Sequence, residues 1–566
     1  MRQWMVAAKK ADFYAIAEKF HVDPVVARII RNREVIGEKN IRIYLGGNLS
    51  DLSDPHQMKD MDRLVEILAQ KIRKQVRIRI IGDYDVDGVT SSHLFLTALR
   101  RVGAKVDVVI PHRIQDGYGL SLHLLQQAKE DGVDTILTCD NGIAAIDEIA
   151  WAKAQKMTVL VTDHHAVPFE EHEGRRTEKK SLADAVVNPH QQDCGYPYKE
   201  LCGAGVAWNV IRVLYENYDM DKREAEDLLD FVAMATVCDV MSLTGENRIL
   251  VKEGLKRIRH TKNIGLQALM QACNVQPENI SAYHFGYVLG PCVNATGRLD
   301  TARHALRLFE TGQETEAEEI ARDLVDLNQE RKELTLQGVE MAKKLCEEGG
   351  YENDPVLVLF LPDVHESIAG LIAGRIREMY NRPVFVLTRG EEGVKGSGRS
   401  TENYSMYENM CGCVELFTKF GGHPMAAGLS LPEENVEKFR RKINENCPLT
   451  VEEVCPDIHI DMAMPVGYAS TELVHQFALL EPFGKDNPSP LFADRNLSIS
   501  RMWLIGKNRN VLRMSVLSEY GQPVPVIFFG DVETLFAYFT EKFGQKEVEN
   551  ALHGRKNRIL FSMVYT

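Results

Sequence analysis

Three groups of acidic and imidazole side chains each follow directly on a short run rich in β-branched residues. The groups are Gly82-Asp83-Tyr84-Asp85-Val86-Asp87-Gly88, Cys139-Asp140-Asn141-Gly142 and Thr162-Asp163-His164-His165. If the runs are parallel strands, their carboxyl ends meet along one edge of a sheet, where open α/β folds bind ligands. Carboxylates and imidazoles gathered there suit two divalent cations about 3.5–4 Å apart, the arrangement that catalyses phosphoester hydrolysis. The sequence therefore predicts a metal-dependent phosphoesterase.

The spacing of the apolar runs supports a parallel sheet, because its βα units recur about every 30 residues. The runs are short and continuous, as is typical of strands covered on both faces. We therefore expect a doubly wound α/β domain. Its expected strands are Val76–Ile81, Val106–Ile110, Thr135–Thr138, Met157–Val161 and Ala185–Val187, and its expected helices are Thr90–Val102, Leu122–Asp131 and Ala144–Gln155.

The first acidic group has a structural alternative. Asp83, Asp85 and Asp87 could form a solvated turn, or a calcium loop of the EF-hand type. An EF-hand loop needs a bidentate Glu at its twelfth position and flanking helices. That position is Leu94, and a strand precedes the loop, so the sequence argues against an EF-hand. Adjacent histidines such as His164 and His165 are often surface or core residues, but their alignment with two acidic strand ends favours metal ligands.

Length and composition limit the remaining possibilities. The chain has 566 residues, of which 44% are hydrophobic, and this predicts three or four domains with separate cores. No apolar stretch is long enough to span a bilayer and the N-terminus lacks a secretory signal, so we expect a cytoplasmic protein without membrane contact. The eleven cysteines lack metal-site or disulfide spacing and are expected to be reduced thiols. A net charge of −14 argues against a general nucleic-acid coat.

Two clusters of basic residues could nevertheless contact nucleic acid. A run of charge is more often only a solvated surface. The second cluster is the better candidate, because it lies among strand patterns. The first cluster is Lys71, Arg73, Lys74, Arg77 and Arg79, and the second is Lys507, Arg509, Arg513, Arg555, Lys556 and Arg558.

The second half of the chain divides into three parts. Residues 311–348 contain almost no Pro or Gly and repeat apolar residues at helical spacing, which predicts a long connecting helix with Gly338 as the candidate break. A second α/β domain follows, with the Gly-rich strings Lys395–Ser400 and Gly421–Pro424. From about Asp457 the pattern is mostly strands and fits a small OB-type β-barrel, a fold that commonly binds single strands.

Several short segments of the sequence resemble the successive motifs of the DHH phosphoesterase superfamily. They are GDYDVDG, CDNG, TDHH, Val237-Cys238-Asp239-Val240 and Asn294-Ala295-Thr296-Gly297-Arg298-Leu299, with GSGRS and GGHPMAAG resembling the associated second domain. Glu481-Pro482-Phe483-Gly484 with Asn487-Pro488 resembles the start of the C-terminal domain of RecJ-like exonucleases. The resemblance covers residues 50 to 566. It implies an N-terminal extension (1–50), a DHH catalytic domain (51–310), a connecting helix (311–348), a DHH-associated substrate-binding domain (349–455) and an OB-like nucleic-acid-binding domain (456–566).

The resemblance also implies the metal ligands. The positions concerned are Asp83, Asp85, Asp87, Asp140, Asp163, His164 and Asp239, with His165 in or beside the same shell. Carboxylate oxygen with little imidazole suits manganese or magnesium better than zinc, so we expect two divalent cations, Mn²⁺ or Mg²⁺. Asp163 could instead orient a histidine without touching metal.

A further set is expected to act on the substrate. Gly396-Ser397-Gly398 could be a simple turn, but with Arg399 it offers a phosphate cradle. His423 could be a core histidine, although its Gly-Gly approach favours substrate contact. Arg298 and His423 are expected to stabilise the developing charge, which gives the catalytic set Asp83, Asp85, Asp140, His164, His165, Arg298 and His423. The expected substrate-binding set is Arg113, Asn294, Arg298, Ser397, Arg399, Ser400, Gly422 and His423.

The resemblance implies a 5′-to-3′ exonuclease that degrades single-stranded DNA to mononucleotides during recombination and repair. We expect a monomer that works with a helicase and a single-strand-binding protein. One rival hypothesis is an oligoribonuclease or cyclic-dinucleotide phosphodiesterase of the same superfamily, but these usually lack the C-terminal extension. The other is a replication factor that holds single strands without cutting, but all metal positions here keep acidic or histidine side chains.

Overall fold

The structure is a computed structural model that describes residues 4–113, 116–117, 119–172, 175–390, 393–454, 457–506, 511–518 and 520–566. The chain forms two compact units. The first consists of Gly47–Pro456 with the short segment Pro482–Asn487. The second consists of Arg2–Gly46, Asp457–Glu481 and Pro488–Thr566, so both ends of the chain belong to it.

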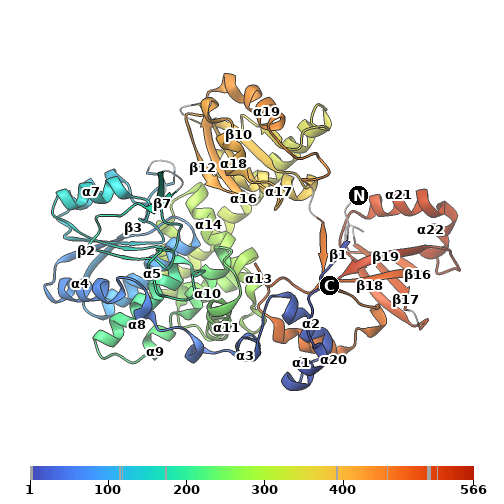
Figure 1. The fold of residues 1–566 in the computed structure, drawn as a ribbon, viewed down its shortest axis with the longest axis horizontal. Helices are drawn as coiled ribbons and strands as arrows, with labels where there is room; N and C mark the ends of the chain where they lie inside the picture. The colour runs from blue at the N-terminus through green and yellow to red at the C-terminus, as the bar shows by residue number, and fades with distance from the viewer. Residues whose placement is uncertain are drawn as a thin grey trace. The chain divides into compact units, whose positions relative to one another are not determined.

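The first unit begins with a five-stranded sheet in which every pair of neighbouring strands is parallel. The strand order is β3-β2-β4-β5-β8, so the chain reverses direction across the sheet between β2 and β4. Helices cover both faces, with α4 and α8 below and α7 above the sheet in Figure 1. The doubly wound prediction is confirmed. The strands are Arg77–Ile81 (β2), Lys105–Val109 (β3), Thr135–Cys139 (β4), Thr158–Thr162 (β5) and Ala185–Val187 (β8), and the helices are Met61–Arg73 (α4), Val86–Arg101 (α5), Leu122–Glu130 (α6), Ile146–Ala154 (α7) and Gly203–Asn217 (α8).

A helical region follows the sheet and ends in α16 (Glu314–Glu347), the expected long helix. It has 34 residues, which corresponds to about 51 Å. Its first half buries Ala321 and Leu324 in the core of the first domain, and its second half buries Ala342 in the next core. The helix is continuous through Gly338, so the possible break there is not observed. The other helices are Arg223–Glu226 (α9), Leu229–Cys238 (α10), Gly245–Ile258 (α11), Ile264–Ala272 (α12), Pro277–Asn279 (η3), Ala282–His284 (α13), Phe285–Leu289 (η4), Gly290–Leu299 (α14) and Arg303–Glu310 (α15).

A second α/β domain completes the first unit. Its sheet has the order β12-β13-β11-β10-β9, in which only the pair β9–β10 is parallel. The helix α17 (Glu366–Tyr380) connects β9 to β10 and packs against α16, while α18 and α19 belong to the core on the other face. The remaining elements are β9 (Leu357–Phe360), β10 (Val384–Gly390), β11 (Gly393–Arg399), β12 (Lys419–His423), β13 (Ala426–Leu431), α18 (Met406–Cys411) and α19 (Val436–Glu445).

The second unit joins the two ends of the chain. The strand β1 (Trp4–Val6) pairs in parallel with β14 (Ile458–Ile460), and α2 (Pro24–Asn32) buries Val26, Ile29 and Ile30. Arg33 forms an ion pair of 2.7 Å with Asp461, and both side chains are almost fully buried. The N-terminal residues are therefore an integral part of this unit.

The C-terminal sheet is curled and OB-like, as the strand pattern predicted. The long strand β16 (Phe492–Ile505) pairs with β15 (Met462–Ala463), β17 (Val511–Leu517) and β19 (Leu560–Tyr565), and β18 (Pro523–Phe528) pairs with β17. Alternate residues such as Met502, Leu512 and Met514 face a core that includes Phe539 of α21 (Val532–Phe543) and Ala551 of α22 (Gln545–Leu552). In the part of the chain that the structure describes, no helix has both the length and the apolar character needed to cross a bilayer.

Candidate active site

The three acidic groups meet at the carboxyl edge of the parallel sheet. They follow β2, β4 and β5, and the first two strands flank the point where the strand order reverses, the usual ligand site of doubly wound sheets. The end of α10 brings a fourth carboxylate, Asp239, to the same place. Within the described residues the candidate ligand atoms form three groups, Asp140–His164–His165, Asp87–His164–Asp239 and Asp83–Asp85–Asp140, whose members lie within 4.8 Å of one another.

His164 is at the centre of this cluster. Its Nε2 atom lies 3.1 Å from Asp140 Oδ1 and 3.6 Å from both Asp87 Oδ2 and Asp239 Oδ2. Burial lowers the pKa of His164, so the ring is neutral and can offer a nitrogen lone pair. Carboxylates from three different segments therefore surround one available imidazole nitrogen.

Local backbone structure fixes the orientation of the carboxylates. Asp85 caps α5, its Oδ1 accepting the backbone N–H groups of Asp87 and Gly88. Asp87 accepts the first two N–H groups of α8, from Gly203 at 2.6 Å and from Ala204 at 2.8 Å. A Cβ on Gly203 would lie only 2.6 Å from Asp140 Cβ, so glycine is required where α8 meets the metal cluster. The sequence interpretation did not include Gly203, although a Gly-Ala-Gly string at a helix start is a recognisable anion-binding signal.

The electrostatics of the cluster call for cations. Burial, followed by the charges of the neighbouring aspartates, raises the pKa of Asp83, Asp140 and Asp239 well above the ordinary range. The buried Oδ1 of Asp83 has no hydrogen-bond partner among the described residues. Buried carboxylates of this kind are costly unless they are paired or bound to metal. The donor set, mostly carboxylate oxygen with one or two imidazoles, fits Mn²⁺ or Mg²⁺.

Asp163 lies beside the cluster and uses both of its oxygens on protein donors. Oδ1 accepts the backbone N–H groups of His164 and His165 and contacts His165 Nδ1 at 2.8 Å, and Oδ2 accepts the N–H of Ile143. Although burial opposes it, this contact raises the pKa of His165 to about 9. The geometry favours the orienting role for Asp163 over direct metal binding.

The three expected substrate-binding arginines gather in the same unit. Burial and the charge of Arg113 lower the pKa of Arg298 to about 10, and burial and Arg113 likewise lower the pKa of Arg399. Arg298 donates to the carbonyl of Ser367 at 2.6 Å and Arg399 to the carbonyl of Gly398 at 2.7 Å, while Arg113 stacks over the ring of Tyr84 at 4.9 Å. These guanidinium groups have no carboxylate partner within the described residues, and such an arrangement is suited to binding an anion.

A hollow of about 510 Å³ opens at this cluster. It is lined by Tyr84 and Arg113 from the first domain and by Ser397 from the second. Tyr84 stands between Asp83 and Asp85, so a single loop serves both the metal cluster and the pocket. The lining also contains Lys419 and Phe420, which the sequence did not single out, and Lys395 from the Gly-rich string.

The other expected substrate residues have different surroundings. Asn294 accepts the backbone N–H of Val86 with Oδ1 and so anchors the start of α5. The buried hydroxyl of Ser400 donates to the carbonyl of Tyr404. His423 ends β12 on the exposed surface and does not belong to the pocket lining, and Gly422 is required there because a Cβ would lie 2.5 Å from the carbonyl oxygen of Ala426. The structure thus joins Ser397 and Arg399 with Arg113 and Arg298, but not with His423.

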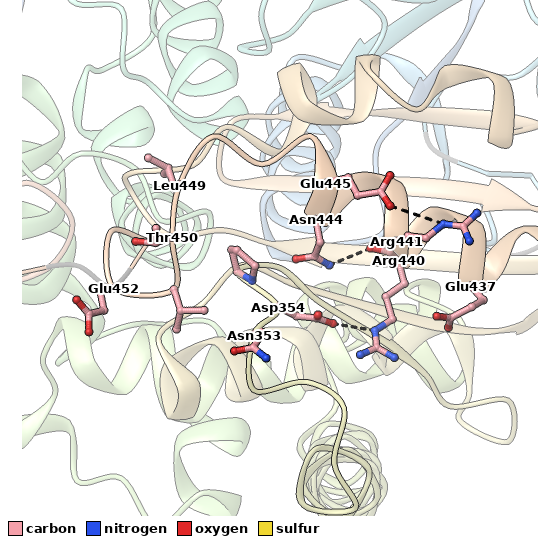
Figure 2. A pocket seen from close by; sticks show the side chains of 12 residues that line it. Asn353, Asp354, Glu437, Arg440, Arg441, Asn444, Glu445, Leu449, Thr450 and Glu452 are labelled. Carbon is pink, nitrogen blue, oxygen red and sulfur yellow. Dashed lines mark hydrogen bonds and ion pairs between the residues drawn. The ribbon is translucent and has the colours of Figure 1, made fainter.

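A second hollow of about 870 Å³ in the same domain has a structural explanation (Figure 2). Its cations are neutralised, because Arg440 pairs with Asp354 at 2.7 Å and Arg441 with Glu445 at 3.9 Å. Asn444 holds the start of β9 by hydrogen bonds to the backbone of Val356. The hollow therefore lacks, within the described residues, the unpaired positive charge that marks the pocket beside Tyr84.

The first basic cluster of the sequence is largely structural. Lys71 pairs with Asp134, and Arg77 and Arg79 pair with Asp107, all at the amino end of the sheet. This end is opposite the metal cluster. Of the second cluster, Arg513 lies beside the ring of Trp503, whereas Lys507 and Arg509 lie outside the described residues.

The doubly wound sheet and its acidic edge, joined by a long helix to a second α/β domain, define a metal-binding protein of the DHH class. Three family descriptions match the chain: "DHH family, N-terminal domain" at residues 77–236, "DHHA1 domain" at 353–447 and "RecJ OB domain" at 460–558. The chain is 34% identical to the single-stranded-DNA-specific exonuclease RecJ of Haemophilus influenzae over 518 residues, which is 88% of both proteins. The chain belongs to the RecJ family.

Two further comparisons support this assignment. The chain is 33% identical to RecJ of Bacillus subtilis over 90% of its own length, and this match spans 63% of that longer protein. The crystal structure of RecJ from Thermus thermophilus in complex with Mn²⁺ superposes with a TM-score of 0.77 at 27% identity, covering 92% of this chain and 74% of that one. The long helix, the second domain and the curled C-terminal sheet are thus features of a solved family member.

Proposed function

We propose that the protein is a single-stranded-DNA-specific exonuclease that removes 5′-mononucleotides from a 5′ end by two-metal hydrolysis. One observation carries the proposal. The loop Asp83–Asp85 contributes carboxylates to the metal cluster, and its Tyr84 lines a pocket beside unpaired arginines. A terminal phosphate held in that pocket would bring the adjacent phosphodiester to the metals. An exonuclease that starts at a phosphorylated end requires this placement.

The proposed roles of the residues follow from their positions. Asp83, Asp85, Asp87, Asp140, His164 and Asp239 hold two Mn²⁺ or Mg²⁺ ions, and Asp163 positions His165. Bound cations of this kind activate water and stabilise the leaving oxygen. Arg113, Ser397 and Arg399 grip the terminal phosphate, and Arg298, anchored on Ser367, offers positive charge to the scissile phosphate. Asn294 keeps the first acidic loop in place.

The other parts of the chain have supporting roles in this proposal. Segment 51–310 carries the chemistry, 349–455 selects the strand end and 456–566 prolongs contact with single-stranded DNA, as the match to the RecJ OB domain supports. We further propose that the protein acts as a monomer in recombination and repair, alongside a helicase and a single-strand-binding protein. An oligoribonuclease or cyclic-dinucleotide enzyme has no evident use for such a C-terminal segment.

The decisive experiment removes one of the side chains proposed to bind the terminal phosphate. Arg399→Ala should abolish the advantage of a 5′-phosphorylated strand over a 5′-hydroxyl strand, while Mn²⁺ binding stays unchanged, because the guanidinium contacts the terminal phosphate and not the metals. The measurement is the initial cleavage rate on both strands. Arg389→Ala, in which an exposed arginine paired with Glu433 is lost from the same domain, is the matched control. Equal rates on both strands with the unaltered protein would contradict the proposed polarity.

A further inference from the structure

Two thiols of the first unit are in direct contact. The Sγ atoms of Cys273 and Cys292 lie 3.8 Å apart, and both residues are free cysteines. Cys273 caps the C-terminal end of α12, whereas Cys292 belongs to α14. Cys273 is partly exposed and Cys292 is only 1% exposed, so solvent reaches the pair from the side of Cys273.

The surroundings of Cys292 stabilise a negative charge on its sulfur. The long helix α16 contributes Asn328, whose amide donates to Cys292 Sγ at 3.3 Å. The hydrogen bond from Cys273 lowers the pKa of Cys292 against the effect of burial, and it raises the pKa of Cys273. Asn328 and the positive charges of Lys332 and Arg331 lower the pKa of the Cys292 thiol further. The two sulfurs therefore share one proton when the pair ionises.

A metal ion is a poor occupant of this pair. A structural zinc site has four protein ligands, and a catalytic one has three. Within the part of the chain that the structure describes, neither Cys273 nor Cys292 belongs to a group of three or more side chains able to hold a metal ion. The charged side chains that act on Cys292 are cations, which repel another cation. A partly exposed thiol beside a second thiol of lowered pKa is instead typical of redox-active cysteines.

The helix that carries Cys292 also holds the first acidic loop in place. Asn294, two residues further along α14, accepts the N–H of Val86 at the start of α5. A Cβ on Gly297 would lie 2.4 Å from the carbonyl oxygen of Tyr84, so this turn of α14 packs directly against the loop. A displacement of α14 would therefore reach the carboxylates of the metal cluster.

The other end of α14 contacts a second part of the cluster. A Cβ on Gly290 would lie 2.3 Å from Sγ of Cys238, and the Cys238 thiol donates to the carbonyl of Phe285 just before α14. Cys238 is the last residue of α10 and directly precedes Asp239, a candidate metal ligand. The helix α14 thus packs against two of the segments that supply carboxylates, and Cys292 lies between these two contacts.

Disulfide formation would have to move this helix. A sulfur–sulfur bond is about 2 Å long, so the two Sγ atoms must approach each other by about 1.8 Å. The end of α12 resists the movement, because Val275 beyond Cys273 is buried and its N–H donates to the carbonyl of Met270. Oxidation also removes the thiol hydrogen that Cys292 donates to the carbonyl of Val288 at 3.2 Å. The displacement is therefore shared by α14.

We propose that Cys273 and Cys292 are an oxidation site, which peroxide converts to a reversible disulfide, and that this modification weakens cation binding at the acidic cluster. The inference goes beyond the proposed function, because it concerns the affinity of the cluster for cations and not the substrate. Outer contacts that orient metal ligands commonly affect metal affinity, and α14 supplies such contacts.

The oxidation balances with hydrogen peroxide as the oxidant. When the pair ionises, proton transfer between the sulfurs allows the accessible Cys273 to carry the charge and attack one peroxide oxygen. The O–O bond breaks, Cys273 becomes a sulfenic acid, and the hydroxide that leaves takes up the proton released by the pair. The Cys292 thiol then attacks the sulfenic sulfur, the S–O bond breaks, and a second water leaves with the thiol proton. The two sulfurs lose two electrons in total, and a dithiol reductant restores them.

The first test identifies the modification. Full-length protein that is treated with hydrogen peroxide and digested without reduction should yield two peptides joined through Cys273 and Cys292. Mass spectrometry should show that the joined peptides lack the two thiol hydrogens and separate on treatment with dithiothreitol. Cys292→Ser should leave Cys273 as a sulfenic acid that dimedone traps, because the second thiol is missing. Absence of the joined peptides from oxidised, folded protein would overturn the proposal.

The second test measures the consequence for the cluster. Calorimetry without substrate should show that oxidised protein binds Mn²⁺ about tenfold more weakly than reduced protein, and dithiothreitol should restore the affinity. Cys273→Ser should keep the affinity of the reduced protein after peroxide treatment. Cys411→Ser, which removes an exposed cysteine from the second domain, is the matched control and should remain sensitive to peroxide.

The two tests have distinct outcomes. If the oxidised protein contains the disulfide but binds Mn²⁺ as tightly as the reduced protein, the effect on the cluster is refuted. If Cys273→Ser remains as sensitive to peroxide as the unaltered protein, another residue is responsible and the assignment to this pair is wrong. Failure of the reduced protein to cut single strands would contradict only the proposed function, since neither test depends on cleavage.

Discussion

The buried carboxylates of Asp83, Asp140 and Asp239 are suited to binding cations. Each is buried among other carboxylates, and burial first and neighbouring charge second raise the pKa of each. In the metal-free protein, part of the cluster therefore holds protons at a pH where a solvent-exposed aspartate is ionised. Cation binding must displace those protons.

This leads to a prediction about pH. Because the folded-state pKa values are raised, the metal-free protein should lose stability as pH rises through them, and Mn²⁺ affinity should increase over the same pH range. Titration calorimetry in two buffers of different ionisation enthalpy should detect proton release on Mn²⁺ binding. Asp140→Asn should reduce the release, and the exposed control Asp326→Asn should not. A pH-independent affinity with no proton release would contradict the electrostatic description.

Residue spacing was sufficient to predict part of this site. Asp83, Asp140 and His164 follow strands. The carboxyl ends of parallel strands lie at the same edge of the sheet, and this does not depend on the conformation of the loops. Asp239 ends a helix and came only from the family resemblance, since no local periodicity places α10 beside the sheet. Lys419, Phe420 and Gly203 were missed because their partners are distant in sequence and were invisible to local patterns.

At the scale of elements, the glycine inside α16 has a role opposite to the one its type suggested. Gly338 does not interrupt the helix; it allows α17 to approach. A Cβ at this position would lie 2.3 Å from Cδ1 and 3.1 Å from Cγ1 of Ile372, which is fully buried. Sequence alone cannot separate these roles, because a glycine that breaks a helix and one that makes room for a neighbour have the same local signature.

Gly338→Val should accordingly destabilise the protein by about 1–3 kcal/mol, because the added side chain overpacks the α16–α17 contact. The matched control is Gly374→Val within α17, where a Cβ meets nothing within 4 Å. Its effect should stay within about 0.5 kcal/mol. Chemical denaturation followed by circular dichroism measures both changes. Equal effects of the two substitutions would show that helix propensity, not packing, determines the outcome.

At the scale of the whole molecule, the second unit depends on both ends of the chain. Removing residues 457–566 alone should leave the N-terminal segment without its partners: β14 for the strand β1, Gln476 for the N–H of Asp23, and Asp461 for buried Arg33. Such a chain should aggregate, because it exposes an apolar helix face and a buried charge without its partner. A chain limited to residues 47–456 should remain monodisperse. Size-exclusion chromatography with light scattering compares the two, and a monodisperse 1–456 chain would contradict this dependence.

The role of the N-terminal segment could not be inferred from its sequence. Its helices are amphipathic, but periodicity does not reveal which distant segment covers them. The catalytic sheet, the long helix and the C-terminal strands were predictable because each depends on repetition within a few tens of residues. The pairing of β1 with β14 depends on contacts across more than four hundred residues.

The ion pair between Arg33 and Asp461 can form only late in synthesis, because 428 residues separate the two. At about 5–20 residues per second, the emerging N-terminal helices wait roughly 20–90 s on the ribosome before their partners are made. During that interval the catalytic unit between them can fold, while an apolar helix face stays uncovered. Residues 457–566 thus complete a unit that residues 4–46 began, which makes this N-terminal segment a natural client for a chaperone until the strands that cover it leave the ribosome.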